Sequence, residues 1–189
     1  MVNFAPHAPH GLVDEPITAI LQGAAPNQPL SVEISTNDHE QRRWSRRFEV
    51  QADSSGRIDL TQASQADDGL GYDPHGLVHQ LTPDEPARWT NQISFTLHPL
   101  TILINVRDPA TGAPLASTEF VRTFTTADVI RHEWRTNTTT ANLYKPTHIR
   151  NSRAVIVLPG AWGGFDWCNQ IAALIASRGR PALALPYFD

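Results

Sequence analysis

The first two thirds of the chain alternate apolar and polar residues, the period of two that turns one side of a β-strand toward a core. The alternating apolar positions are Val32 and Ile34, Phe48 and Val50, Ile93, Phe95 and Leu97, and Ile102, Ile104 and Val106. Turn-forming residues separate these stretches, at 24–29, 53–56, 67–74 and 108–114. Short strands separated by turns predict an antiparallel, immunoglobulin-like β-sandwich over residues 11–126, preceded by a flexible leader at 1–10.

The pattern changes near Ala127. Residues 129–135 and 141–145 are expected to form a hairpin across a polar, threonine-rich tract. Residues 154–158, Ala-Val-Ile-Val-Leu, are apolar without a break. Such a run predicts a strand buried on both faces, as in a parallel sheet covered by helices. A glycine-rich loop, 159–164, follows directly.

Helical spacing follows this loop. The positions that show it are Trp167, Ile171, Leu174, Ile175 and Arg178. Asp166 is placed to cap the start of the helix, and Gly179 to end it. A second apolar run at 182–185 completes a strand–loop–helix–strand unit of the βαβ type. Because residues 127–189 are too few to close an α/β domain, we expect them to be the incomplete opening of one.

Composition excludes several classes of protein. The chain is 40% hydrophobic, enough for a core, and its net charge of −4 argues against a dedicated nucleic-acid-binding protein, whose usual footprint is basic. No apolar run approaches the roughly 20 residues of a membrane-spanning helix. Cys168 is the only cysteine, so no internal disulfide is expected. Because Met1–Gly11 also lacks the features of a secretion signal, we expect a cytoplasmic protein.

Two features raise the question of a nucleophile or a metal. Cys168 lies inside the expected helix, without a strand-to-helix elbow or an adjacent histidine, which favours an inert cysteine. His75 and His79 are four residues apart, a spacing that suits zinc ligands on a helix. The neighbouring residues 73–74, Asp-Pro, and Gly76 disfavour a helix, and no third ligand is suitably spaced. We therefore expect neither a metal site nor a cofactor.

Several segments of the chain occur in an order and spacing that chance rarely produces. They are Leu12–Pro16, Gly56–Leu60 with Ala63 and Ser64, Gly71–Leu77 with Leu81 and Pro83, Gly160–Gly164, and Ala173–Tyr187. In these segments the chain resembles the family of acyl-CoA thioesterases and bile-acid-CoA:amino-acid N-acyltransferases. In that family a β-sandwich precedes a catalytic α/β-hydrolase domain. His75 and His79 depart from the apolar or aromatic residues of the family, which bears on substrate preference.

The resemblance implies an intact protein that hydrolyses acyl-CoA thioesters or passes the acyl group to an amino acid. Residues 127–189 are then the truncated beginning of the α/β-hydrolase domain. Acyl transfer needs a nucleophile, a base and an orienting acid, and the sequence contains no serine or cysteine elbow of the form G-x-S-x-G. In the family all three groups lie further downstream. This chain is therefore expected to lack them and to be an inactive fragment by itself.

One catalytic element is expected within the chain, in the loop from Gly160 to Gly164. In α/β-hydrolases the loop after the third strand supplies a backbone N–H group to the oxyanion hole. Ala161 or Trp162 would be the donor here. The alternative is that Gly160, Gly163 and Gly164 only permit a tight strand-to-helix turn.

The basic cluster at residues 42–47, Arg-Arg-Trp-Ser-Arg-Arg, has two interpretations. It would either attract the phosphates of coenzyme A or form a solvated strand edge on which arginines discourage pairing with other chains. The second is favoured, because an alternating strand must present polar residues outward. Two other functions also stay open: a non-catalytic β-sandwich binding module, and an esterase resembling the dienelactone hydrolases.

Overall fold

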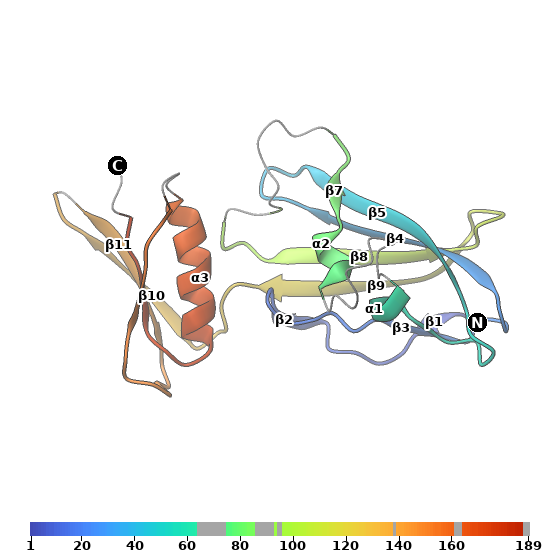
Figure 1. Ribbon diagram of the computed structural model, residues 1–189, viewed down its shortest axis with the longest axis horizontal. Coiled ribbons are helices and arrows are strands. Elements are labelled where there is room, and N and C mark those ends of the chain that lie inside the picture. Colours follow the sequence, from blue (N-terminus) through green and yellow to red (C-terminus); the bar gives the residue numbers. More distant parts are fainter. Residues whose placement is uncertain (64–74, 86–92, 94–95, 138, 161–163, 187–189) are drawn as a thin grey trace. The chain divides into compact units, whose positions relative to one another are not determined.

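The computed structural model describes residues 1–63, 75–85, 93, 96–137, 139–160 and 164–186. It divides the chain into two compact units (Figure 1). Unit 1 comprises residues 1–11, 15–93 and 100–122, and unit 2 comprises residues 12–14, 94–99 and 123–189. The main division, between Arg122 and Thr123, lies slightly before the boundary expected after residue 126.

Unit 1 is built from two β-sheets. The strands of the larger sheet, in spatial order, are β2 (His10–Leu12), β9 (Pro114–Thr123), β8 (Leu100–Arg107), β4 (Pro29–Asn37), β5 (Arg43–Gln51) and β7 (Thr82–Pro83). The smaller sheet has the order β1 (Asn3–Phe4), β3 (Ile20–Gln22) and β6 (Ile58–Asp59). Two one-turn helices, α1 (Leu60–Ala63) and α2 (Gly76–His79), lie in the connection after β6. The unit is rich in β structure, as the alternating pattern predicts.

Strands β4 and β8 confirm the alternation read from the sequence. Val32 and Ile34 are fully buried, and the antiparallel register places them opposite Val106 and Ile104. The intervening residues, such as Glu33, point away from this row because successive side chains of a strand alternate between its faces. The two sheets share one core, to which β3, β6 and β9 also contribute residues.

The expected strand at residues 93–97 does not form in the part of the chain that is described. Ile93, Thr96 and Leu97 lie in bends. Ile93 packs against the core of unit 1, whereas Leu97 packs against the core of unit 2. The apolar residues of this stretch therefore serve two different cores, which one regular strand does not allow.

Residues 1–10, expected as a flexible leader, contain β1 and the start of β2. Phe4 pairs with Leu21, and the Ala5 N–H donates to the Ile20 carbonyl at 2.8 Å. Val2 is buried in the core of unit 1. The structure differs from the expectation because main-chain pairing with β3 holds this stretch in the smaller sheet.

Unit 2 contains one four-stranded sheet and one long helix. The strands, in spatial order, are β10 (Val129–Arg135), β11 (Thr140–Pro146), β13 (Ala182–Ala184) and β12 (Val155–Val157). Helix α3 (Phe165–Ser177) connects β12 to β13, and these two strands are parallel. The β10–β11 hairpin and the strand–loop–helix–strand unit are therefore confirmed.

Helix α3 begins and ends at glycines. Gly164 precedes the first turn with a φ of 115°, in the left-handed region that favours glycine. The expectation that Asp166 caps the helix is wrong, because Asp166 lies inside the first turn and Gly164 occupies the capping position without a side chain. Gly179, with a φ of 85°, follows the end of the helix as expected.

The buried face of α3 consists of small residues. The apolar residues with 0% exposure are Cys168, Ala172, Ala173 and Ala176. The bulky residues that define the helical spacing lie further out, and Trp167 is 40% exposed. The small side chains bring the helix close to Ala182 and Ala184 of β13, which are also fully buried.

The face of this sheet opposite α3 carries exposed apolar residues. Ile156 is 60% exposed, so the expectation that the run 154–158 is buried on both faces is wrong for this chain. The register places Ile156 beside Leu183, and Leu183 beside Leu143, in one row across the sheet. Val157, which alternates with Ile156, packs with α3 instead.

We expect Ile104→Ala to lower the free energy of unfolding of unit 1 by about 2–5 kcal/mol, because it opens a cavity in a close-packed core. The adjacent residue on β8 supplies a matched control: Leu103 is 37% exposed, whereas Ile104 is fully buried. Urea denaturation of the two alanine variants and the unmodified chain measures the difference. Equal losses in both variants would contradict the inward orientation of Ile104.

Candidate functional site

A cavity of about 370 Å³ lies within unit 2, where α3 begins. It is lined by Thr96, Leu97, His98, Arg131, Asn142, Phe165, Asp166 and Asn169. Three of these residues come from the first turns of the helix, and β12 runs into the loop that precedes it. In α/β folds, ligands bind in crevices outside the carboxyl ends of the strands. This cavity is therefore the candidate site of unit 2.

Three buried polar side chains meet at one oxygen atom beside this cavity. The Asn142 Nδ2 group donates to Asn169 Oδ1 at 2.7 Å, and the Tyr144 hydroxyl donates to the same oxygen at 2.9 Å. Asn142 is 0% exposed, and its Oδ1 atom has no hydrogen-bond partner among the described residues. Because buried polar atoms are almost always paired, Asn142 Oδ1 is a candidate acceptor for an N–H or O–H group of a ligand.

Burial raises the pKa of Tyr144 to about 12. This pKa already includes the charge of Arg131, which opposes the shift, and the smaller effect of the Asp166 carboxylate, which adds to it. Tyr144 therefore stays protonated well above neutral pH, and its hydroxyl remains a donor to Asn169.

A hydrogen bond from α3 fixes the segment that carries His98. The Gln170 Nε2 group donates to the Thr96 carbonyl at 2.9 Å. Thr96 Oγ1 in turn accepts from the His98 backbone N–H at 3.2 Å. Residues 96–98 thus form one wall of the cavity although they lie far from α3 in the sequence.

The described lining of the cavity offers polar groups to a ligand but contains no serine or cysteine to attack one. The nearest thiol in the sequence, Cys168, is fully buried, and burial raises its pKa. A protonated, inaccessible thiol is a poor nucleophile. The geometry therefore agrees with an inert Cys168.

The predicted oxyanion donors Ala161 and Trp162, together with Gly163, lie outside the described residues. Gly160 and Gly164, which flank these residues, are described, and only one of them needs to be a glycine. Gly164 needs its left-handed backbone to start α3, which agrees with a role in the turn. A Cβ atom on Gly160 would meet no described atom within 4 Å, so nothing in the described structure requires a glycine there.

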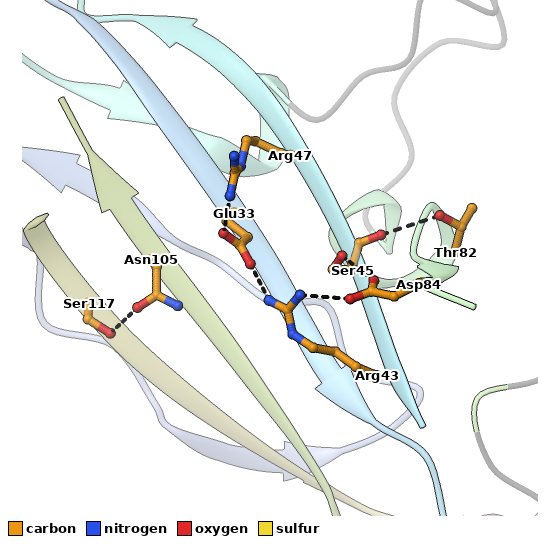
Figure 2. A network of polar contacts seen from close by, with 8 residues as sticks. All are labelled: Glu33, Arg43, Ser45, Arg47, Thr82, Asp84, Asn105 and Ser117. Atoms are coloured by element: carbon orange, nitrogen blue, oxygen red, sulfur yellow. Dashed lines mark hydrogen bonds and ion pairs between the residues drawn. The ribbon is translucent and has the colours of Figure 1, made fainter. Parts of the chain in front are cut away.

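The arginines of the basic cluster 42–47 are engaged with carboxylates on the outer face of β4 and β5. Figure 2 shows Arg43 between Glu33 and Asp84, and Arg47 donating to Glu33 at 2.8 Å. Hydrogen bonds from Arg47 and Arg43 lower the pKa of Glu33 below its usual value. Carboxylates thus already balance these two arginines, which does not favour a phosphate site.

The remaining arginines of the cluster also have partners. Arg42 donates to Asp38 at 2.7 Å, and the Arg46 guanidinium lies over the Phe48 ring at 5.0 Å. Strand β7 pairs with β5 at Trp44 and Ser45, so this part of β5 is not an edge of the sheet. The cluster is a polar outer surface of a strand that lies between two others.

The expectation that no helix forms around His75 and His79 is wrong. The backbone N–H groups of Val78 and His79 both donate to the His75 carbonyl, which closes the single turn α2. The two imidazole rings stack, with centroids 5.4 Å apart. Within the described ranges, no three histidine, cysteine or acidic side chains gather to hold a metal ion.

Sequence reasoning missed the polar cluster of unit 2. A signal was available, since Asn142 lies within the otherwise regular strand β11 and Asn169 and Gln170 lie on the buried side of α3. Buried amides in such positions indicate a hydrogen-bonded network. The sequence pattern does not show that β11 and α3 contact each other.

Comparison with known proteins identifies the family. The family described as acyl-CoA thioester hydrolase/BAAT N-terminal region matches residues 14–136, more than half of the chain. The chain belongs to this family, and the resemblance noted in the sequence is confirmed.

The related proteins include several thioesterases. Mouse acyl-coenzyme A thioesterase 6 is 30% identical over 180 residues, which are 93% of this chain and 42% of the relative. Human mitochondrial acyl-coenzyme A thioesterase 2 is 28% identical over 181 residues, 93% of this chain and 37% of the relative. The mouse peroxisomal succinyl-coenzyme A thioesterase is also 28% identical, over 93% of this chain and 42% of its own length. The chain thus spans about two fifths of the length of these relatives.

No helix in the described part of the chain has the length and apolar character needed to cross a membrane.

The raised pKa of Tyr144 predicts a loss of stability at alkaline pH. The pKa of Tyr144 is about 10 in the unfolded chain and about 12 in the folded chain. Between these values the unfolded state binds fewer protons, so the free energy of unfolding falls as pH rises. We expect this component to be absent in Tyr144→Phe. Urea denaturation of both proteins from neutral to alkaline pH tests it, and parallel pH dependences would contradict it.

Proposed function

We propose that the chain is the N-terminal portion of an enzyme that hydrolyses acyl-CoA thioesters or transfers the acyl group to an amino acid. One observation carries the proposal: relatives named as acyl-CoA thioesterases match over 93% of this chain, through both of its units. Acyl-CoA is then the substrate of the intact protein.

In this proposal, unit 1 is an immunoglobulin-like β-sandwich and unit 2 is the opening of an α/β-hydrolase domain. The shared core of the two sheets supports the first part. The parallel strands β12 and β13, joined through α3, support the second. The exposed side chains of Ile156 and Leu158 give further support, since the sheet of an α/β domain is covered by helices on both faces.

Residues 160–164 are proposed to line the oxyanion hole. Their place, between β12 and the start of α3, is the place from which α/β-hydrolases supply one of the two backbone N–H donors. No described atom lies within 4 Å of a Cβ atom built on Gly160, which supports a close approach of substrate to the backbone there. Ala161 or Trp162 is the proposed donor.

The nucleophile, the base and the acid are proposed to lie downstream of Asp189. The absence of a glycine-flanked serine or cysteine elbow from the sequence supports this, and so does the burial of Cys168. The 189-residue chain alone is therefore proposed to be inactive. A cytoplasmic location is kept as a proposal, supported by the single cysteine, although related thioesterases are named as mitochondrial or peroxisomal.

The protein encoded by the complete gene is expected to release free coenzyme A from acyl-CoA thioesters, because it would supply the missing catalytic groups. The chain ending at Asp189 is expected to release none above a buffer blank. A thiol-reactive dye measures the release with acyl chains of increasing length, with and without added amino acids, which distinguishes hydrolysis from transfer. Turnover by the short chain would contradict its proposed inactivity. Turnover of simple esters but not of thioesters by the intact protein would contradict the proposed substrate.

Proline substitution in the intact protein tests the oxyanion donor. Ala161→Pro and Trp162→Pro each remove one backbone N–H group. Loss of the true donor is expected to lower kcat by roughly 100- to 1,000-fold. Ser152→Pro is the matched control, since it also introduces a proline in unit 2 but at an exposed position outside the strands and helices and outside this loop. If neither loop variant, shown by circular dichroism to be folded, loses more activity than the control, the assignment of this loop fails.

A further inference from the structure

A second cavity, of about 280 Å³, lies within unit 1 beside the end of β9. Its polar lining consists of His7, His10, Glu15, Thr18 and Arg122. All of these residues belong to unit 1. The cavity takes no part in the chemistry proposed for unit 2.

Arg122 is an arginine buried with little compensation. It is only 5% exposed, and its Nη1 group donates to the Val121 and Pro9 carbonyls at 3.2 and 3.4 Å. Its Nε atom is buried and has no acceptor among the described residues. A guanidinium offers five donors and keeps its charge, and neutral carbonyls do not balance that charge. These two carbonyls therefore leave the Nε–H group without an acceptor, and the charge of the guanidinium is balanced only from elsewhere in the cavity lining.

Glu15 supplies the nearby negative charge. A Cβ atom built on Gly11 would lie 2.7 Å from Glu15 Oε2 and 3.3 Å from Arg122 Nη1, so both groups flank this glycine. Burial lowers the pKa of Arg122, and the charge of Glu15 opposes that shift. Glu15 repels any anion that enters the cavity, and it repels a doubly charged anion more strongly than a singly charged carboxylate.

His7 forms a fixed wall of the cavity. Its Nδ1 group donates to the Ala5 carbonyl at 3.0 Å, which leaves Nε2 of the neutral ring to accept from the Thr118 hydroxyl at 3.0 Å. Its ring also packs on Phe120, with centroids 4.6 Å apart. With both nitrogens engaged, His7 shapes the cavity and reports on its contents without itself binding an anion.

We propose that this cavity binds a small monocarboxylate. The carboxylate accepts hydrogen bonds from the Arg122 guanidinium, which suits the planar, two-oxygen geometry of the group. A short apolar body lies against Pro6, Pro16 and Ile20, which belong to the apolar part of the lining. The inference goes beyond the proposed function and does not depend on it, although a carboxylic acid is also the acid product of thioester hydrolysis.

Titration of the 189-residue chain with acetate, butyrate and hexanoate at constant ionic strength tests the proposal. Nuclear magnetic resonance signals of the His7 and His10 rings are expected to shift in a saturable manner. The corresponding primary amides, which match the carboxylates in shape but carry no charge, are expected to cause no such shift. Inorganic phosphate is expected to bind more weakly than the carboxylates, because Glu15 repels its second charge.

Two substitutions act in opposite directions. Arg122→Gln is expected to raise the Kd for butyrate by about tenfold or more, because it removes a charged hydrogen-bond donor. Glu15→Gln is expected to lower the Kd by about threefold or more, because it removes the repelling charge. Arg57→Gln, at an exposed arginine of the same unit, is the matched control and is expected to leave the Kd unchanged.

Several outcomes would overturn the proposal. These are the absence of saturable shifts in the unmodified chain, equal binding of amides or phosphate, and an unchanged Kd in folded Arg122→Gln. If Arg122→Gln fails to fold, the comparison of Glu15→Gln with the unmodified chain still decides, since weaker or unchanged carboxylate binding in Glu15→Gln contradicts the proposed charge balance. A purely structural role for Arg122 predicts no ligand-dependent shift in any of these proteins.

Discussion

The packing of two apolar rows at the centre of the larger sheet is the constraint on which unit 1 depends. Ile34 of β4 lies opposite Ile104 of β8, and these rows exclude water from one side of both strands. A shift of one residue in the pairing of β4 with β8 would turn an apolar row toward solvent, so the pairing register is strongly fixed. Features on both sides of the sheet depend on this register. Glu33 reaches the arginines of β5 only from the outer face, and Arg122 reaches its buried position through the pairing of β9 with β8.

Unit 2 depends on a different constraint, the close approach of a helix with small side chains to a sheet. Cys168 and the alanines of α3 let the helix lie against β13. This approach brings Asn169 within hydrogen-bonding distance of two side chains of β11. The opposite face of the sheet keeps Ile156 in contact with water. Apolar surface left exposed in this way costs free energy, and in the proposed intact enzyme further elements of the hydrolase domain cover it.

Each of the two units of the chain contains a cavity. The family match extends from unit 1 into unit 2, so both units belong to the inherited architecture. The cavity of unit 2 lies at the start of α3, where α/β folds place ligands. The cavity of unit 1 is a separate one, and its lining includes the buried cation Arg122. The proposed oxyanion donor and the proposed carboxylate site therefore lie in different units of one chain.

The sequence by itself determined the periodicities. Alternation placed the core rows of β4 and β8, turn residues separated the strands, and helical spacing with Gly179 located α3. The order and spacing of several short segments indicated the family. Only the tertiary structure decided which side of each element is covered: it exposed Trp167 and buried Cys168, divided the apolar residues of 93–97 between two cores, and left Arg122 at the end of β9 buried beside a cavity. The physical reason is that periodicity reports how side chains are arranged around one element, whereas burial and hydrogen bonding depend on elements that arrive from distant parts of the chain.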